Sequence, residues 1–153
     1  MAPTWCVRVI LFLAAGAPAA GQRLRIVNGC ADETLWIATG SAAAPLGDAP
    51  IRLAPREGHS FTTPDGLRGA RYWPKARCDH LGHHCSVGEE LGCDSTGGCS
   101  NPVDSRFEAS FGLSGMDEVG VGLLDGWTLP FRVRLVGHCA VRRGGGGGGG
   151  GGG

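Results

Sequence analysis

Residues 129–135 read Leu-Pro-Phe-Arg-Val-Arg-Leu, and this stretch indicates the fold class most directly. Phe131, Val133 and Leu135 alternate with arginine, so an extended chain would place the apolar side chains on one face and the charged ones on the other. A period of two residues is typical of a β-strand that buries one face, whereas a helix repeats its apolar positions every three or four residues. The stretch therefore predicts a half-buried strand.

Similar short patterns recur along the rest of the chain. Residues 107–111 read Phe-Glu-Ala-Ser-Phe, with apolar residues at alternate places. Further short runs rich in β-branched and aromatic residues occupy 24–39, 51–62 and 71–73. Pro-Asp-Gly at 64–66 is a strong turn signal, and Pro74 is expected to end the strand before it. Short strands separated by turns, with no long window of helical period after the N-terminal segment, predict an all-β sandwich or barrel.

The N-terminal segment has the three parts of a secretory signal. Arg8 is the only charged residue before Arg23, an apolar run covers 9–15, and small residues follow at 17–21. The run is shorter than the roughly 20 residues that span a bilayer, and the three parts together are typical of a signal peptide. We expect residues 1–20 to be a signal peptide and the protein to be secreted and extracellular. The alternatives are an organellar transit peptide and an uncleaved anchor.

The remaining chain divides into residues 22–143, expected to form one domain, and the polyglycine tail 144–153, expected from its composition to be disordered. The 153 residues include 14 basic and 14 acidic side chains, so the formal net charge is zero. This balance argues against a nucleic-acid partner, which normally requires a basic surface. A hydrophobic content of 42%, with four Trp and five Phe, supplies a core for a globular domain.

Cysteine usage predicts a disulfide framework. Cleavage of the signal would remove Cys6 and leave six of the seven cysteines, an even set in an exported chain. The spacings favour two local pairs and leave two cysteines over: Cys78–Cys85, Cys93–Cys99, and Cys30 with Cys139. Segment 78–85 also contains three histidines, and its thiolates and imidazoles could bind zinc in a reducing compartment. Export favours the disulfide, so we expect no metal and no other cofactor.

Two carboxylates are the candidate catalytic residues. Glu108 lies between Phe107 and Phe111 on the opposite parity, so its side chain should face away from whatever the aromatic residues bury. Asp117 lies past the next turn, and a hairpin would bring both carboxylates close together on one face. Such a pair could share acid–base work in glycoside hydrolysis, although spacing alone favours a solvated edge.

Five motifs in order resemble the thaumatin-like protein family (thaumatin and pathogenesis-related family 5). The motifs are Ile26–Cys30 followed by Leu35-Trp36, Leu53–Phe61, Arg71–Cys78, Phe107–Gly112 with Asp117, and Leu124–Pro130. The last two are the sharpest, because Phe-Glu-Ala-Ser-Phe-Gly and Leu-Asp-Gly-Trp-Thr-Leu-Pro follow the family's Glu-Phe-Thr-Leu and Val-Asp-Gly-Phe-Asn-Leu-Pro. Order and spacing agree over roughly residues 24–133.

The resemblance implies a secreted, disulfide-stapled, flattened β-sandwich with the two local cysteine pairs. It also implies an acidic cleft made of an Arg, a Glu and several Asp, through which some members bind or weakly cleave β-1,3-glucans. Glu108 falls on the family glutamate and Asp117 on its first aspartate, whereas the arginine falls near Asn101 and the second aspartate at Gly120. The later half of longer members, including the strand that carries the partner of Cys30, has no counterpart here. We therefore expect a sandwich that is incomplete at its C-terminus.

These expectations favour a secreted binding module with a defence-like role. It would recognise cell-wall polysaccharide of the β-1,3-glucan type through Glu108, Asp117 and Asn101, with no or weak catalysis. Two alternatives stay open: a weak endo-β-1,3-glucanase that uses the two carboxylates, and a truncated chain without independent function.

Aromatic side chains and the remaining partners complete the expectations. Tyr72, Trp73 and Trp127 are candidates for stacking on sugar rings, although burial in the core is the more common role of such residues. Cys30 and Cys139 are expected either to pair with each other or to stay free. The protein is expected to be a monomer that does not associate with membranes after signal cleavage.

Overall fold

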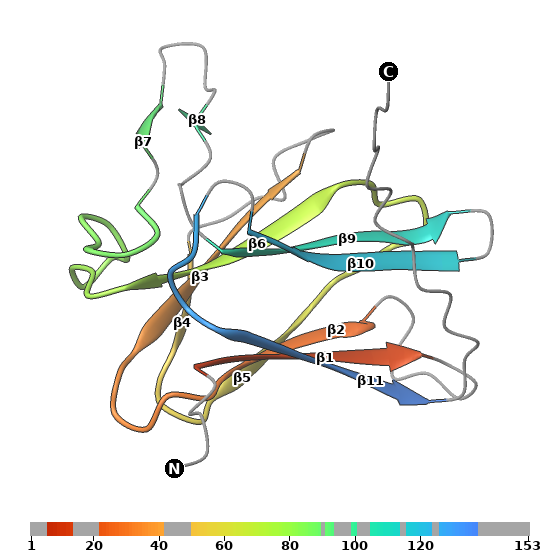
Figure 1. Cartoon of the computed structure of the whole chain (residues 1–153), viewed down its shortest axis with the longest axis horizontal. Helices are drawn as coiled ribbons and strands as arrows, with labels where there is room; N and C mark the ends of the chain where they lie inside the picture. The colour runs from red at the N-terminus through yellow and green to blue at the C-terminus, as the bar shows by residue number, and fades with distance from the viewer. Residues whose placement is uncertain are drawn as a thin grey trace, which may run out of the picture.

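The structure is a computed structural model, and it describes residues 6–13, 22–41, 50–89, 91–93, 99–100, 105–113, 116–123 and 126–137. Those residues form two stacked β-sheets and a short two-stranded ribbon (Figure 1). No helix occurs among them, and so none of them forms a helical membrane span. The all-β fold predicted from the alternating patterns is confirmed, and so is the sandwich that the resemblance implied.

The first sheet has the strand order β11-β1-β2-β5. Its strands are Phe131–Gly137 (β11), Val7–Leu13 (β1), Leu24–Asn28 (β2) and Gly58–Phe61 (β5). β1 runs antiparallel to β2 and parallel to β11, so that Val9 lies between Ile26 and Val133. The strand predicted near 129–135 is present, but it lies at the edge of the sheet, and Val133 and Leu135 remain 38% and 39% exposed.

The second sheet has the strand order β10-β9-β6-β3-β4. Its strands are Met116–Gly122 (β10), Arg106–Leu113 (β9), Ala70–Ala76 (β6), Leu35–Ser41 (β3) and Ile51–Leu53 (β4), while Leu91–Cys93 (β7) and Cys99–Ser100 (β8) form the ribbon. The expectation that Pro74 ends a strand is wrong, because β6 continues to Ala76. Pro74 lies beyond the part of β6 that pairs with β9, where a missing N–H is tolerated.

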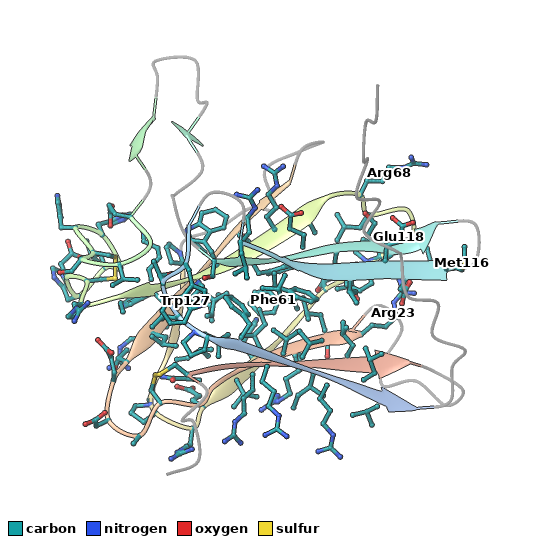
Figure 2. The ribbon with its side chains drawn as sticks, in the orientation of Figure 1. Arg23, Phe61, Arg68, Met116, Glu118 and Trp127 are labelled. Carbon is teal, nitrogen blue, oxygen red and sulfur yellow. A yellow bond between two sulfur atoms is a disulfide. The ribbon has the colours of Figure 1, made fainter. Side chains whose placement is uncertain are left out.

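Aromatic rings join the two sheets at the centre of the core. Phe61 comes from the first sheet, and Figure 2 shows it between the layers. Its ring centroid lies 5.0 Å from that of Tyr72, which in turn lies 6.2 Å from that of Phe107, and both partners belong to the second sheet. Burial raises the pKa of Tyr72 to about 12, so its hydroxyl stays protonated.

Asn28 is fully buried at the end of β2, and its side chain connects the two sheets. Its Nδ2 donates to the carbonyl oxygens of Glu33 at 2.7 Å and Leu53 at 3.0 Å. Its Oδ1 accepts from the backbone N–H of Cys30 at 3.0 Å. Since Leu53 belongs to β4, one amide holds β2 to the opposite layer and fixes the turn that leads into β3.

Residues 9–13, which belong to the apolar run of the expected signal peptide, lie in β1 in the middle of the first sheet. Val7, Val9 and Leu11 are 0%, 0% and 2% exposed, because they alternate with outward-facing residues and cover the core as a strand does. Removal of a signal peptide stays a prediction. It would take β1 away from between β2 and β11.

The expected pairing of Cys30 with Cys139 is wrong in this structure. Cys30 forms a disulfide with Cys6. Cys6 directly precedes β1 and Cys30 follows β2, so the antiparallel pairing of these strands brings the two cysteines together. Cys139 and the polyglycine tail lie outside the described residues.

A chain that begins at Gln22 should be much less stable than the full chain. It loses three buried apolar side chains of β1, which contribute about 1.5–3 kcal/mol each. It also loses a disulfide that spans 24 residues, which contributes about 3–4 kcal/mol. Thermal unfolding followed by circular dichroism measures the loss, and a thiol assay reports the freed Cys30.

The matched control is the full chain with Cys6→Ser and Cys30→Ser, which keeps β1 and loses only the disulfide. Its midpoint should lie between the other two. Equal midpoints for the full and shortened chains would contradict the structural role of β1.

Candidate functional site

Glu108 lies on the outer face of the second sheet, as its parity on β9 predicted. Its side chain is 40% exposed. The Oε1 atom accepts a hydrogen bond from Nε of Arg106 at 2.6 Å and lies 3.4 Å from Nε of Arg71. Two guanidinium groups therefore balance the negative charge of this carboxylate. Glu108 lies directly opposite Gly120 of β10.

Asp117 belongs to a different ion-pair cluster at one end of the sandwich. Its Oδ1 accepts from the backbone N–H of Gly112 at 2.8 Å and lies 3.2 Å from Nη1 of Arg23. Arg23, which is labelled in Figure 2, also binds Asp65 at 2.7 Å. Its guanidinium lies 5.2 Å from the ring centre of Phe111. Only 14% of the Asp117 side chain is exposed, so this carboxylate mainly holds the two sheets together.

The hairpin expected between β9 and β10 is present, but it does not place Glu108 and Asp117 opposite each other. The register pairs Glu108 with Gly120, and Asp117 lies three positions away, or about 10 Å along a strand. A β-bulge between Met116 and Glu118 takes Asp117 out of the regular pairing with β9. The Asp117 side chain binds Arg23 and not a residue beside Glu108. Ligand binding by Glu108, Asp117 and Asn101 stays a prediction, and Asn101 lies outside the described residues.

The cysteines near the end of β6 form a closed loop. Cys78 and Cys85 are joined in a disulfide. Zinc binding by this segment would need both sulfur atoms as thiolates, and the disulfide uses them. In the ribbon, the backbone register pairs Cys93 with Cys99, and a bond between them stays a prediction.

Asp79 organises the interior of the disulfide loop. Its Oδ1 accepts from the backbone N–H groups of Leu81 and His83, each at 2.9 Å, and its Oδ2 lies 3.0 Å from Nδ1 of His84. The hydrogen bond from His84, followed by those from the backbone, holds the pKa of Asp79 well below its usual range. The same contact raises the pKa of His84.

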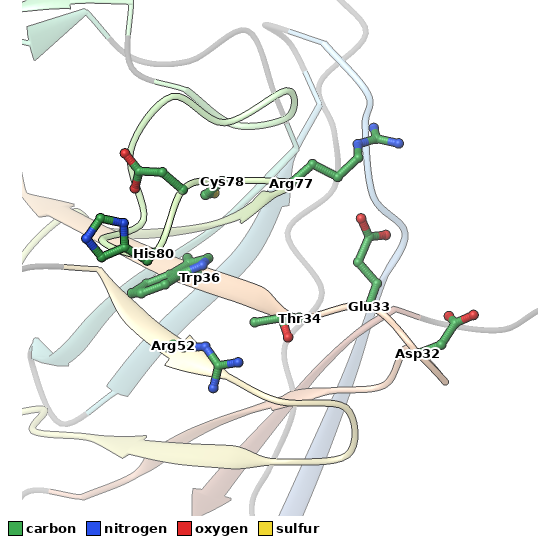
Figure 3. A pocket seen from close by; sticks show the side chains of 9 residues that line it. Asp32, Glu33, Thr34, Trp36, Arg52, Arg77, Cys78 and His80 are labelled. Carbon is green, nitrogen blue, oxygen red and sulfur yellow. The ribbon is translucent and has the colours of Figure 1, made fainter.

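A pocket of about 690 Å³ lies between this loop and the turn before β3 (Figure 3). Its lining residues are Asp32, Glu33 and Thr34 before β3, Trp36 and Arg52 on β3 and β4, and Arg77, Cys78, Asp79 and His80 after β6. Trp36 pairs directly with Arg52 across β3 and β4, so both side chains share the outer face of the sheet. Gly82 packs against the indole ring so closely that a Cβ there would lie 2.7 Å from Cε3 of Trp36.

The aromatic residues expected to stack on sugars have different surroundings. Tyr72 and Trp73 are 2% and 6% exposed, whereas Trp127 is 67% exposed. Trp36, which lines the pocket, was not among the candidates. Its position between two buried apolar residues of β3 gives the signal that would have found it, because alternation places it on the outer face.

Two plant proteins are similar to this chain. Pathogenesis-related protein 5 of Arabidopsis thaliana is 29% identical over 129 residues, which cover 82% of this chain and 53% of that protein. An osmotin-like protein of Solanum lycopersicum is 26% identical over 117 residues, which cover 72% of this chain and 46% of that protein. The chain spans about half the length of these curated relatives. No family model and no solved structure matches it. The resemblance to thaumatin-like proteins is confirmed at this level of similarity.

His84 should titrate above the ordinary range of histidine, and Asp79→Asn should remove that shift. Because the folded-state pKa is raised, the stabilising contact is complete below the unfolded-state pKa and is lost as pH rises through the folded-state value. The lowered pKa of Asp79 means that acid breaks the contact only as pH falls through that lower value. A histidine-ring NMR titration measures the shift. Asp65→Asn, which removes a carboxylate bound to Arg23 instead, should leave the His84 titration unchanged.

Gly120→Asp should be tolerated, because a Cβ at this position meets no atom within 4 Å. In thaumatin-like proteins the second aspartate of the acidic cleft falls at this position. The substitution would therefore place a carboxylate directly opposite Glu108. Gly112→Asp is the matched control: its Cβ would lie 2.5 Å from Oδ1 of Asp65 at a φ of +67°. We expect the control to lose about 1–3 kcal/mol in denaturant unfolding and Gly120→Asp to change by about 0.5 kcal/mol at most. Equal losses would contradict the open space at Gly120.

Proposed function

We propose that this protein is a secreted, defence-related protein of thaumatin-like type that binds cell-wall polysaccharide of the β-1,3-glucan class without efficient catalysis. Support comes from the two plant relatives, from the five motifs, and from one feature of the surface. That feature is the partly exposed carboxylate of Glu108 on an open polar face. The guanidinium groups of Arg71 and Arg106, which lie beside Glu108, can donate hydrogen bonds to the hydroxyl groups of a sugar.

The polar face consists of the outward-facing side chains of three adjacent strands. We call it the polar strip, and its residues are Arg71 on β6, Arg106, Glu108 and Ser110 on β9, and Glu118, Gly120 and Gly122 on β10. Gly120 and Gly122 carry no side chains opposite Glu108 and Arg106, so β10 leaves the edge of the strip low. A long polymer can lie across such a surface, whereas a deep pocket would accept only a chain end.

The ion pairs of the strip suit binding better than acid–base catalysis. Arg71 and Arg106 form ion pairs with Glu108, which keep this carboxyl group in its charged form and occupy its Oε1 atom. The residue directly opposite Glu108 is Gly120, and Glu118, the other carboxylate of the strip, lies opposite Ser110. Glycoside hydrolysis requires two carboxyl groups that flank the scissile bond, about 5–9.5 Å apart. In a bound glycan, Glu108 would accept hydroxyl hydrogen bonds while the guanidinium groups donate to hydroxyl and ring oxygens.

Retention on insoluble β-1,3-glucan tests the proposal. The full chain should be retained, and Glu108→Gln should weaken its binding by about tenfold, since a hydrogen bond to a charged group is lost. Asp117→Asn separates the polar strip from the predicted ligand set that also includes Asp117, because Asp117 holds Arg23 at the end of the sandwich and is not part of the strip. It should lower the melting temperature and leave retention nearly unchanged. Equal retention of the parent and Glu108→Gln would count against the polar strip as the binding surface.

A further inference from the structure

We propose that the pocket above Trp36 binds a single neutral sugar ring, at a site separate from the polar strip. The pocket has a volume of about 690 Å³, which lies in the range of about 300–1,000 Å³ that is typical of small-molecule sites. It combines the indole ring of Trp36 with charged groups of both signs. Binding in this pocket does not depend on polysaccharide binding by the strip.

The charges around the pocket nearly cancel. Asp32, Glu33 and Asp79 are negative and Arg52 and Arg77 are positive, so an anion or a cation meets attraction from one set and repulsion from the other. A neutral molecule with many hydroxyl groups can use both sets without bringing a charge of its own. Each hydroxyl can donate to a carboxylate and accept from a guanidinium, so the mixed lining becomes a set of hydrogen-bond partners.

The aromatic surface suits a pyranose ring. The C–H groups on one face of a sugar form an apolar patch that packs against the flat face of an indole. Trp36 lies with its ring among the lining groups in Figure 3, between His80 and Arg52. It remains partly exposed, although its neighbours Leu35 and Ile37 are 0% and 1% exposed and anchor the strand.

The Trp36 ring is held in place before any ligand arrives. Gly82 packs against the ring, and the loop that carries Gly82 is closed by the Cys78–Cys85 disulfide. Asp79 fixes the same loop from within through its backbone hydrogen bonds. Preorganisation of this kind reduces the entropy lost on binding.

The pocket and the polar strip lie on the same face of the second sheet but do not merge. Between Arg71 of the strip and the pocket, β6 presents Trp73 and Lys75, which are 6% and 2% exposed. Gly88 covers this region: its carbonyl accepts from Nε1 of Trp73 at 3.2 Å, and a Cβ on it would lie 2.3 Å from the carbonyl oxygen of Pro74. A ligand in one site therefore does not contact the other.

Indole NMR of the full chain tests the proposal directly. Titration of ¹⁵N-labelled protein with methyl β-D-glucopyranoside should shift the Trp36 Nε1–H signal saturably and leave the buried Trp73 signal in place. Arg52→Ala should weaken this binding by about tenfold, because one charged hydrogen-bond donor is lost. Arg132→Ala, an exposed arginine on β11, is the matched control and should bind like the parent.

The other probes decide between ligand classes and between the two sites. Tighter binding of sodium glucuronate or choline than of the glucoside would overturn the neutral-sugar assignment. Absence of a saturable Trp36 shift, with the folded spectrum preserved, would overturn the site itself. Glu108→Gln should bind the glucoside normally, and Arg52→Ala should still be retained on insoluble glucan. Loss of glucoside binding in Glu108→Gln would show that the two surfaces are one site.

Discussion

The buried amide of Asn28 connects most of the features described above. With 0% exposure, it satisfies a carbonyl of β4, a carbonyl of the turn before β3 and an N–H next to the Cys6–Cys30 disulfide. Buried polar groups cost little only when they are hydrogen-bonded, so each of these partners must keep its place. The turn that Asn28 fixes through Glu33 supplies one wall of the pocket. Inter-sheet spacing and pocket shape thus depend on the same three contacts.

A second buried polar contact arranges the outer face of the second sheet. Lys75 is 2% exposed, and its Nζ lies 3.7 Å from Oε2 of Glu89, which also accepts from the backbone N–H of Cys85 at 2.6 Å. A buried cation without its partner would be costly, so Glu89 and its segment are held over β6. This cover separates the polar strip from the pocket and keeps the disulfide loop beside Trp36. The outer face of the second sheet therefore carries two separate surfaces, the open polar strip and the pocket above Trp36.

Sequence periodicity predicted much of the fold, because burial of one strand face leaves an alternation that is visible in single residues. The buried phenylalanines of β9 and the outward Glu108 are examples, as is the Pro64–Gly66 turn, where Gly66 has a φ of +86° and donates to the carbonyl of Phe111. β1 was missed because an apolar run with one arginine fits a signal peptide as well as a strand. Periodicity does not encode which distant strand pairs with which.

The site was harder to predict than the fold for a similar reason. Spacing placed Glu108 and Asp117 on one hairpin, but a β-bulge and a distant partner, Arg23, decided the position of Asp117. Trp36 and Arg52 come from separate runs and meet only through the β3–β4 register. The disulfide loop then completes their pocket. Contacts between residues far apart in the sequence determine both outcomes, and residue types alone do not specify them.

The parallel pairing of β1 with β11 has a consequence for the order of assembly. β1 is the first described strand to be synthesised, and β11 is the last. The second sheet contains the β9–β10 hairpin and the nearby β3–β4 pair, which can form early, since contacts close in sequence lose less chain entropy. The first sheet cannot be completed until synthesis reaches Gly137, and until then the apolar face of β1 lacks one neighbour. A nascent chain of this protein therefore exposes one edge of β1, with its Val7, Val9 and Leu11, until β11 has been synthesised.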